Sequence, residues 1–354
     1  MLDLQGMTTK EGWLIKEPAA FAPDHTGGYF SQCYFVERDE KRAFLKALDI
    51  EKFPLSQLLP ILAGFQYEGD LFQLCKDQRL SRIVRVLERG DIDRDPTLAP
   101  VLRYVPYMVF ELADGDIRGT VDASKAATNQ WRFYVLHQAT LALIQLHGQD
   151  IAHQDLKPSN VLKFDKTNAD SAVKIKLGDL GRSSRRGVNA PHDGCIAPGA
   201  LNYAPFEQRY SYVLGDWRKR RISADVFHLG CLAVFAFTNV CFPEYIMVTH
   251  MADAYRPENW SATYPDVQAH VTAAMIAALN DLQADFPEEY RSDLVSIVLD
   301  LCHPDPERRG RMSPGLNPLP DQLRLQPFVA RFDALEKRSR IRKPHHAGAT
   351  SQII

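Results

Sequence analysis

Residues 1–112 contain several short stretches in which apolar and polar positions alternate, which is the pattern of half-buried β-strands. Between two of these stretches, apolar residues recur at helical spacing from Leu58 to Leu80. The N-terminal part of the chain is therefore predicted to form a small sheet with one main helix. The predicted strands cover residues 13–15, 32–37, 42–48, 81–88 and 106–113.

The rest of the chain is dominated by helical patterns. Residues 129–149 are amphipathic and end near Gly148, a residue type that is typical of helix C-termini. The longest apolar run, residues 229–242, is too short to span a membrane and is predicted to be a buried core helix. A last helix is predicted over residues 327–335, followed by a basic, flexible tail over residues 336–354.

Composition narrows the class of protein. The chain has 354 residues, of which 45% are hydrophobic and 24% are charged, and its formal net charge is −2. This is an ordinary soluble composition, and without a basic excess we expect no nucleic-acid partner. The N-terminus has no signal pattern, and we expect no membrane association. Six scattered cysteines without a Cys-x-x-Cys pair indicate reduced thiols in a cytoplasmic protein. The neighbours Cys302 and His303 are too few for a zinc site, which needs about four ligands.

The octet His-Gln-Asp-Leu-Lys-Pro-Ser-Asn, residues 153–160, carries the most chemistry in the chain. It offers a carboxylate at Asp155, an ammonium group at Lys157 and an amide at Asn160. An alternating stretch downstream is predicted to be a strand that ends in a second carboxylate, Asp179. Two acids and an amide around one lysine form the set that metal-assisted phosphoryl transfer requires.

The octet resembles the catalytic loop of protein kinases, His-Arg-Asp-Leu-Lys-x-x-Asn, with Gln154 in place of the arginine. Asp179 begins Asp-Leu-Gly, which resembles the metal-binding Asp-Phe-Gly motif of that family. Three structural motifs follow in the order that the family shows: Tyr-Ala-Pro-Phe-Glu at 203–207, Asp225 before Val-Phe-His-Leu-Gly, and Asp-Pro-Glu-Arg-Arg at 305–309. Their order and spacing favour a protein kinase over a small-molecule phosphotransferase.

The resemblance covers roughly residues 13–335 and implies a bilobal α+β fold, with a small antiparallel sheet and one main helix in the N-lobe and a mainly helical C-lobe. We expect the N-lobe over residues 1–112 and the C-lobe over residues 113–335. The resemblance also implies an activation segment over residues 179–207, whose terminal Glu207 pairs with Arg309.

The resemblance implies a role for each polar residue of the site. Asp155 is expected to accept or orient the hydroxyl proton of the substrate, and Lys157 to offset charge on the γ-phosphate of ATP. Asn160 and Asp179 are expected to hold Mg²⁺ through oxygen ligands. Lys157 also favours Ser or Thr as the acceptor, because tyrosine-specific kinases usually lack a lysine at this position.

Nucleotide contacts are implied in both lobes. Lys46 lies in an otherwise apolar strand and needs an anionic partner. The resemblance makes it the lysine that binds the α- and β-phosphates, with Glu68 as its partner. Asp70 is the alternative, although residues two apart on a helix do not share a face. The other implied nucleotide-binding positions are Gly27, Gly28, Glu111, Ala113 and Leu162.

Several positions depart from the family pattern. The Gly-x-Gly-x-x-Gly motif is absent, and Phe44 stands where kinases usually have a small alanine against adenine. Either the adenine site is tight or the strand register is shifted by one residue; Phe110 is expected at the gatekeeper position. Gln154 cannot pair with an activation-loop phosphate. We therefore expect that replacing Ser183 and Ser184 with Ala leaves activity intact.

We predict a stand-alone cytoplasmic Ser/Thr protein kinase that uses ATP and Mg²⁺ and acts on protein substrates. The main alternative is an inactive pseudokinase that serves as a nucleotide- or protein-binding module, which the departures above favour. A small-molecule phosphotransferase is the third. The basic cluster at residues 218–221, Arg-Lys-Arg-Arg, is either a solvated surface or a site that favours acidic substrates.

Overall fold

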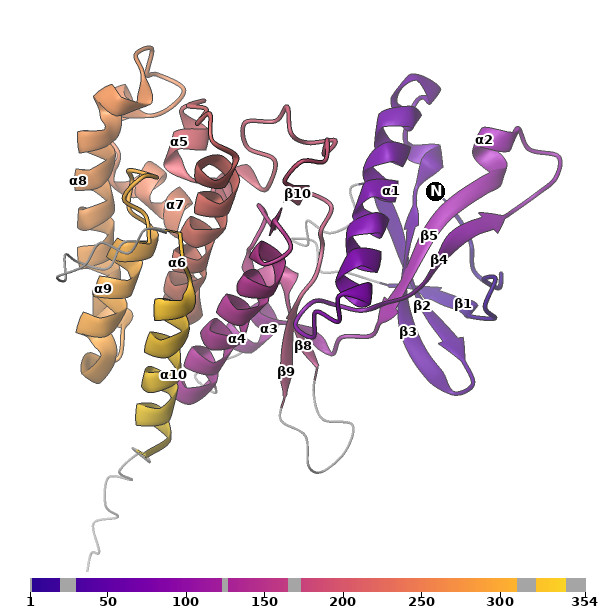
Figure 1. Ribbon diagram of the computed structural model, residues 1–354, viewed down its shortest axis with the longest axis horizontal. Helices are drawn as coiled ribbons and strands as arrows, with labels where there is room; N and C mark the ends of the chain where they lie inside the picture. Colours follow the sequence, from indigo (N-terminus) through magenta and orange to yellow (C-terminus); the bar gives the residue numbers. More distant parts are fainter. Residues whose placement is uncertain (1, 20–29, 123–126, 165–172, 311–322, 342–354) are drawn as a thin grey trace, which may run out of the picture.

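The computed structural model describes residues 2–19, 30–122, 127–164, 173–310 and 323–341. They form two lobes, a sheet with one long helix and a larger, mainly helical body (Figure 1). The bilobal α+β fold that the sequence predicts is confirmed. Gly27 and Gly28 lie outside the described residues.

The N-lobe is a five-stranded antiparallel sheet in the order β1-β2-β3-β5-β4. Its long helix, α1, buries apolar side chains such as Leu58, Leu71 and Phe72, and Gly69 lets the helix approach Arg89 of β4 closely. The elements are β1 Leu14–Pro18, β2 Ser31–Arg38, β3 Lys41–Leu48, η1 Ile50–Lys52, α1 Leu55–Asp77, β4 Val86–Asp93, α2 Pro100–Arg103 and β5 Tyr104–Glu111.

One predicted strand is displaced. The alternation over residues 81–88 predicted a strand there, whereas β4 begins at Val86. The residues before it serve the other lobe: Ile83 forms a parallel bridge with Leu177, and the Val84 N–H donates to the Leu177 carbonyl at 2.9 Å. The alternating pattern is thus divided between two sheets, and contacts distant in sequence decide where the strand begins.

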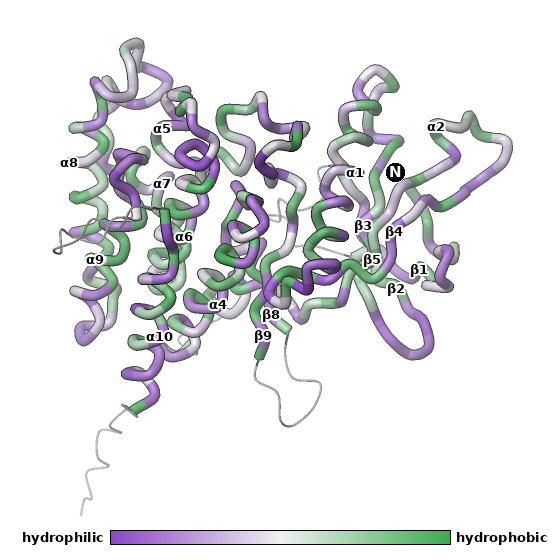
Figure 2. The backbone as a smooth tube through the Cα atoms, viewed as in Figure 1, coloured by the Kyte–Doolittle hydropathy of each residue, from purple (hydrophilic) through white to green (hydrophobic). Residues whose placement is uncertain are grey.

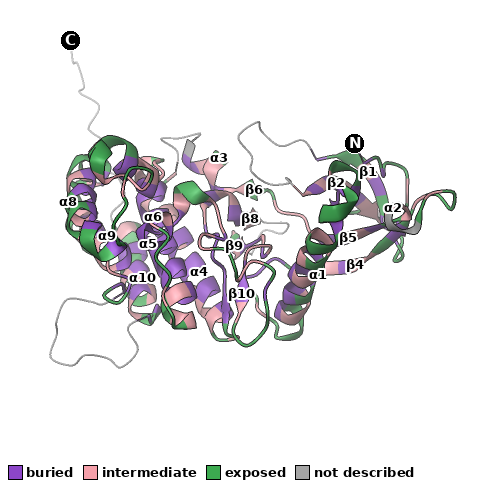
Figure 3. Ribbon diagram, turned by 90° about the horizontal axis from the view of Figure 1, so that it is seen from above, coloured by how far each residue is buried: buried purple, intermediate pink, exposed green. Residues whose placement is uncertain are grey.

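The C-lobe is built around α6, whose residues are buried almost throughout (Figure 3). Residues 218–238 are long and apolar enough to cross a membrane, but 94% of the apolar window is buried inside the protein. The helix is coloured mostly as hydrophobic (Figure 2), and it packs against α4 and α9. The predicted core helix is therefore present, and it ends before Asn239, whose left-handed backbone (φ 59°) terminates it.

The C-lobe elements follow the hinge in this order: β6 Gly115–Asp116, α3 Ile117–Asp122, α4 Asn129–His147, β7 Ile151–Ala152, η2 Pro158–Asn160, β8 Val161–Phe164, β9 Lys174–Leu177, β10 Ser184–Arg185, η3 Leu201–Tyr203, α5 Phe206–Arg209, η4 Arg218–Ile222, α6 Ser223–Thr238, α7 Phe242–Tyr245, η5 Ile246–His250, η6 Asp253–Tyr255, α8 Tyr264–Leu282, η7 Gln283–Asp285, η8 Glu288–Tyr290, α9 Arg291–Leu301 and α10 Gln326–Ile341.

The last helix is longer than the sequence predicts. It was expected to end at residue 335, with a flexible tail from 336, but α10 continues to Ile341 and packs along α4. Charged pairs extend it: Lys337 Nζ lies 2.6 Å from Asp333, and Arg338 Nη1 lies 2.8 Å from Asp293 of α9. The remainder of the predicted tail, residues 342–354, lies outside the described residues.

Candidate active site

The loop at residues 153–160 is held by a buried carboxylate at the start of α6. Asp225 accepts hydrogen bonds from the backbone N–H groups of His153 (2.8 Å) and Gln154 (2.6 Å), and His147 Nε2 lies 2.8 Å away. Burial raises the pKa of Asp225, but the hydrogen bond from His147 and other favourable contacts lower this pKa below its ordinary value. Gln154 has a left-handed backbone (φ 62°), which turns the loop sharply. Hydrogen bonds to Asp225 of α6 thus fix the conformation of this loop.

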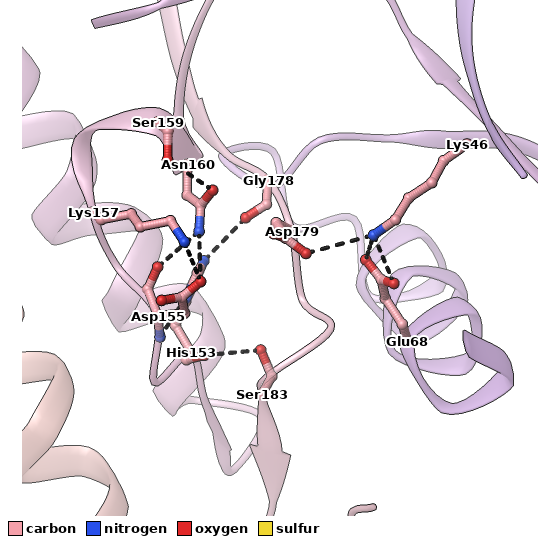
Figure 4. Close-up of polar contacts among 10 residues, drawn as sticks. All are labelled: Lys46, Glu68, His153, Asp155, Lys157, Ser159, Asn160, Gly178, Asp179 and Ser183. Carbon is pink, nitrogen blue, oxygen red and sulfur yellow. Dashed lines mark hydrogen bonds and ion pairs between the residues drawn. The ribbon is translucent and has the colours of Figure 1, made fainter. Parts of the chain in front are cut away.

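Three groups contact the carboxylate of Asp155, and Figure 4 draws two of them, Lys157 and Asn160. Lys157 Nζ donates to Oδ2 at 2.8 Å, and Asn160 Nδ2 donates to the Asp155 carbonyl at 2.8 Å and to Oδ2 at 3.3 Å. From the segment that follows Asp179, the backbone N–H of Ala200 donates to Oδ1 at 2.8 Å. The predicted acid/base residue is therefore held on both oxygens, and the predicted lysine and amide lie beside it.

A second polar group connects the two lobes. Lys46 Nζ of β3 lies 2.8 and 2.9 Å from the two carboxylate oxygens of Glu68 on α1, and 3.5 Å from Asp179 Oδ1 (Figure 4). Burial alone would lower the pKa of Lys46, but the two carboxylates raise it above its ordinary value. Asp70 points elsewhere and pairs with Arg89 at 2.7 Å.

The electrostatics of Asp179 keep its carboxylate ionised. Burial raises its pKa, but the positive charges of Lys46 and Lys157 outweigh that effect and lower the pKa to about 2. The Asp179 side chain is nevertheless 39% exposed, so its oxygens remain accessible. The backbone is left-handed at Asp179 (φ 57°), and the Gly178 N–H donates to the Asn160 carbonyl at 3.0 Å. This bond ties the two predicted metal ligands together through their backbones.

The end of the segment between Asp179 and Glu207 is anchored by a buried ion pair. Arg309 forms two parallel hydrogen bonds to Glu207, each 2.9 Å long, and its side chain is fully buried. Arg309 also donates to the carbonyls of Ser223 (3.1 Å) and His303 (3.1 Å). This is the pairing that the resemblance implies.

Comparison with known proteins places this geometry in a family. The protein kinase domain family matches residues 28–317, which is most of the chain. The chain is a protein kinase domain. Its similar relatives include mitogen-activated protein kinase 12 of Oryza sativa subsp. japonica, 29% identical over 48% of this chain and 28% of the relative. Mitogen-activated protein kinase 19 of Arabidopsis thaliana is 29% identical over 33% of this chain and 19% of its own length. The chain thus spans less than two thirds of the length of these relatives.

The donor set of this kinase domain fits a hard divalent cation. Asn160 uses its Nδ2 for Asp155, and its amide oxygen accepts only a long hydrogen bond from Ser159 (3.5 Å), so a lone pair of that oxygen can coordinate a cation. Asp179 offers an ionised, accessible carboxylate. Oxygen ligands of this kind suit Mg²⁺, which keeps several waters and binds through few protein groups and substrate phosphates. Asn160 and Asp179 would hold the ion, which would screen the charge of the ATP phosphates when bound.

The strand register shows which face of β3 carries Phe44. On β3, Lys46 pairs with Cys33 of β2, and Phe44 pairs with Phe110 of β5. Phe44 and Lys46 are two residues apart on one strand and therefore share a face. Lys46 is the lysine that pairs with Glu68, so Phe44 holds the position two before it, and the tight adenine site stays a prediction. Phe110 is buried and packs edge-to-face on Phe72 of α1, with ring centroids 4.8 Å apart.

Three more predicted nucleotide-binding positions are Glu111 and Ala113, at the connection between the lobes, and Leu162 on β8 of the C-lobe. The Glu111 N–H donates to the Arg85 carbonyl at 3.1 Å, and its carboxylate binds the Arg85 N–H at 2.7 Å and the Lys176 ammonium group of β9. Ala113 lies just beyond β5. Leu162 of β8 is half-buried, and a Cβ at Gly178 would stand 3.0 Å from its side chain. The carboxylate of Glu111 thus links the N-lobe to β9 of the C-lobe, a role that the sequence did not suggest.

Sequence reasoning also missed residues that position the site. The Tyr67 hydroxyl, next to Glu68, accepts the Arg185 N–H at 3.0 Å and so fastens α1 to the activation segment. Cys33 lies opposite Lys46, where burial raises the pKa of its thiol to about 12 and keeps it neutral. Ala200 contacts Asp155 from 45 residues away. No local pattern marks such contacts, since each joins segments distant in sequence.

Proposed function

We propose that this chain is an ATP- and Mg²⁺-dependent protein kinase that transfers the γ-phosphate to Ser or Thr hydroxyls of protein substrates. The observation that carries the proposal is the complete polar set around one point between the lobes: the Lys46–Glu68 pair, the ionised Asp179, and Asp155 with Lys157 and Asn160. Positioning and charge stabilisation are what phosphoryl transfer demands of a protein.

Each residue has a stated task in this proposal. Asp155 orients the substrate hydroxyl and accepts its proton, and Lys157 offsets charge on the transferred phosphoryl group. Lys46 binds the α- and β-phosphates, while Glu68 holds its ammonium group in place. The contact between Lys157 and Asp155 at 2.8 Å supports Ser or Thr as the acceptor. The six free cysteines support a cytoplasmic location.

A second candidate is a kinase fold that binds nucleotide or protein without transferring phosphate. The observation in its favour is Phe44, which shares the face of Lys46. We expect this ring to narrow the space for adenine. Against it stands the hydrogen-bonded Asp155, because a binding module has no use for a restrained catalytic base.

The test is incubation of the purified chain with radiolabelled ATP, Mg²⁺ and a generic protein substrate, alongside Asp155→Asn. The matched control is Asp91→Asn, which removes an exposed carboxylate of β4. We expect label on Ser or Thr in the wild type and the control, and a loss of at least about 100-fold in Asp155→Asn, as for removal of an acid/base group. If the wild type binds ATP but gives no label with Mg²⁺ or Mn²⁺, the binding module replaces the enzyme.

A further inference from the structure

The activation segment contains few groups that a kinase could phosphorylate. Between Asp179 and Glu207 the hydroxyl groups are those of Ser183, Ser184 and Tyr203. Both serines are fully buried, and the Ser183 hydroxyl donates to the His153 carbonyl at 3.2 Å. A phosphate on either serine would have to enter closed space and replace these hydrogen bonds. The segment is nonetheless in contact with the catalytic residue through Ala200.

Asp193 occupies the centre of this segment and collects its hydrogen bonds. One carboxylate oxygen accepts from the Ser184 hydroxyl at 2.8 Å, and the other accepts from the Ala190 N–H at 2.9 Å. The Trp217 indole N–H donates to the same Ser184 hydroxyl at 3.1 Å. The carboxylate of Asp193 thus organises both the start and the middle of the segment.

Arg221 connects Asp193 to the catalytic loop. Its Nη2 donates to the Asp193 carbonyl at 2.8 Å and lies 3.5 Å from the Asp193 carboxylate, while its Nη1 donates to Gln154 Oε1 at 2.8 Å. The Gln154 amide also donates to the Arg182 carbonyl at 2.9 Å. Arg221 is 1% exposed, and Asp193 is the only carboxylate that contacts it in the part of the chain that the structure describes. A buried guanidinium needs such an anion.

Gln154 fits this arrangement because it is neutral. An arginine at this position, as in the family pattern, would set a second guanidinium against buried Arg221 with one carboxylate between them. The cation that faces the activation segment is instead the guanidinium of Arg221, on η4. The basic cluster at residues 218–221 is therefore not simply a solvated surface: Arg220 donates to the carbonyls of Asp193 and Cys195, each at 3.1 Å, and Lys219 pairs with Glu307.

We propose that the Asp193 carboxylate, paired with Arg221 and hydrogen-bonded by Ser184 and Ala190, serves as a built-in anion that keeps the activation segment in its catalytically competent position without phosphorylation. Asp193 is a positioning residue: it acts on Asp155 through the segment that carries Ala200. The proposal rests on the proposed kinase function and specifies how its activity is controlled. It predicts an enzyme whose basal state is its active state.

The expectation that both serines are replaceable also changes. Ser184→Ala removes the hydroxyl that links Asp193 to Trp217, so the rate of phosphoryl transfer should fall. An unchanged rate would mean that this buried link does not support the activation segment. For Ser184 we therefore expect a loss of activity where the sequence alone predicted none, because its side chain is buried and supports the segment.

The experiment uses the full chain after phosphatase treatment, with mass spectrometry to show that no phosphate remains. The rate of phosphoryl transfer to a protein substrate is compared for the wild type, Asp193→Asn, Asp193→Glu and the control Asp91→Asn. We expect full activity in the dephosphorylated wild type and a fall of about 10- to 100-fold in kcat/KM for protein substrate in Asp193→Asn, as for loss of hydrogen bonds to a charged group. The KM for ATP should stay within about twofold, and Asp193→Glu should recover most of the activity.

Hydrogen exchange of residues 183–200 separates failure of this proposal from failure of the kinase function. We expect exchange there to rise at least about tenfold in Asp193→Asn and to remain unchanged in Asp91→Asn, whether or not the protein transfers phosphate. Unchanged exchange overturns the role of Asp193. Loss of wild-type activity on phosphatase treatment, or full activity in Asp193→Asn, also overturns it. A wild type that gives no phosphoryl transfer at all refutes the kinase function. In that case the hydrogen-exchange data alone decide whether Asp193 holds the activation segment in place.

Discussion

The buried histidine beneath the catalytic loop gives a quantitative prediction about stability and pH. His228 lies in the buried face of α6 and is 3% exposed, and its Nδ1 has no hydrogen-bond partner. Burial lowers its pKa to about 4, against the opposing effect of the Asp225 and Asp155 carboxylates; His153 and Arg309 lower it further. The folded protein therefore keeps this ring neutral at pH values where the unfolded chain would protonate it.

The sign and size of the effect follow from linkage. Between an unfolded pKa of 6.5 and a folded pKa of about 4, the unfolded state binds one more proton than the folded state, so stability falls as pH falls. The contribution of His228 is complete above pH 6.5 and is lost progressively down to pH 4. At 1.36 kcal/mol per pKa unit the full effect is roughly 3 kcal/mol, of which about 2 kcal/mol is lost between pH 7.5 and pH 5.

The assay is urea denaturation at pH 7.5 and pH 5 for the wild type and His228→Gln, a side chain that does not titrate. The wild type should lose about 2 kcal/mol more free energy of unfolding than the variant on going to pH 5. His270→Gln is the control for removal of an imidazole elsewhere, because His270 is exposed on α8, where its ring stacks on Tyr255. Equal losses in wild type and His228→Gln would refute the reasoning, because they would mean that the buried ring accepts a proton as readily as a solvated one.

Two further predictions concern the frame of the activation segment. Glu207→Gln leaves the guanidinium of Arg309 buried without its anion, and urea denaturation should show a loss of about 3–5 kcal/mol; a change below about 1 kcal/mol would contradict the importance of this pair. Gly199→Ala places a Cβ 2.8 Å from Asp155 Oδ1 and should lower kcat about 10- to 100-fold in steady-state kinetics. Gly194→Ala is the control and should have no effect, because the space around Gly194 is open. Equal rates in both variants would argue against close packing over the catalytic residue.

The sequence predicted most of the site because its motifs carry chemistry and spacing together. Lys46 and Glu68 were paired by their place in a strand and a helix, and the structure brings them within 2.8 Å. The same holds for Glu207 and Arg309, which are separated by 102 residues. For Lys46, an ammonium group in an otherwise apolar strand requires an anionic partner, and that requirement is visible without coordinates. The choice of Glu68 as that partner, and the pairing of Glu207 with Arg309, came from the resemblance to protein kinases.

Other features were beyond the reach of local patterns. The alternation over residues 81–88 fits a strand of either sheet, and only the bridge from Ile83 to Leu177 shows that its first half belongs with the C-lobe. The cluster at residues 218–221 appears from sequence as a run of exposed charges. Burial of Arg221 follows from the position of Asp193, which no periodicity encodes. Long-range packing therefore decides what propensity and charge leave open.

The hydrogen bonds of Asp155 bear on whether this fold is built for transfer or for binding. A carboxylate offers about four lone-pair sites. Oδ1 accepts from Ala200, and Oδ2 accepts from Lys157 at 2.8 Å and Asn160 at 3.3 Å, so these hydrogen bonds leave one lone pair of Oδ1 unused. The carboxylate is thus restrained on both sides without being saturated. An acid/base group needs both properties, because its orientation must be fixed before the substrate arrives and a lone pair must remain to accept the proton of the hydroxyl.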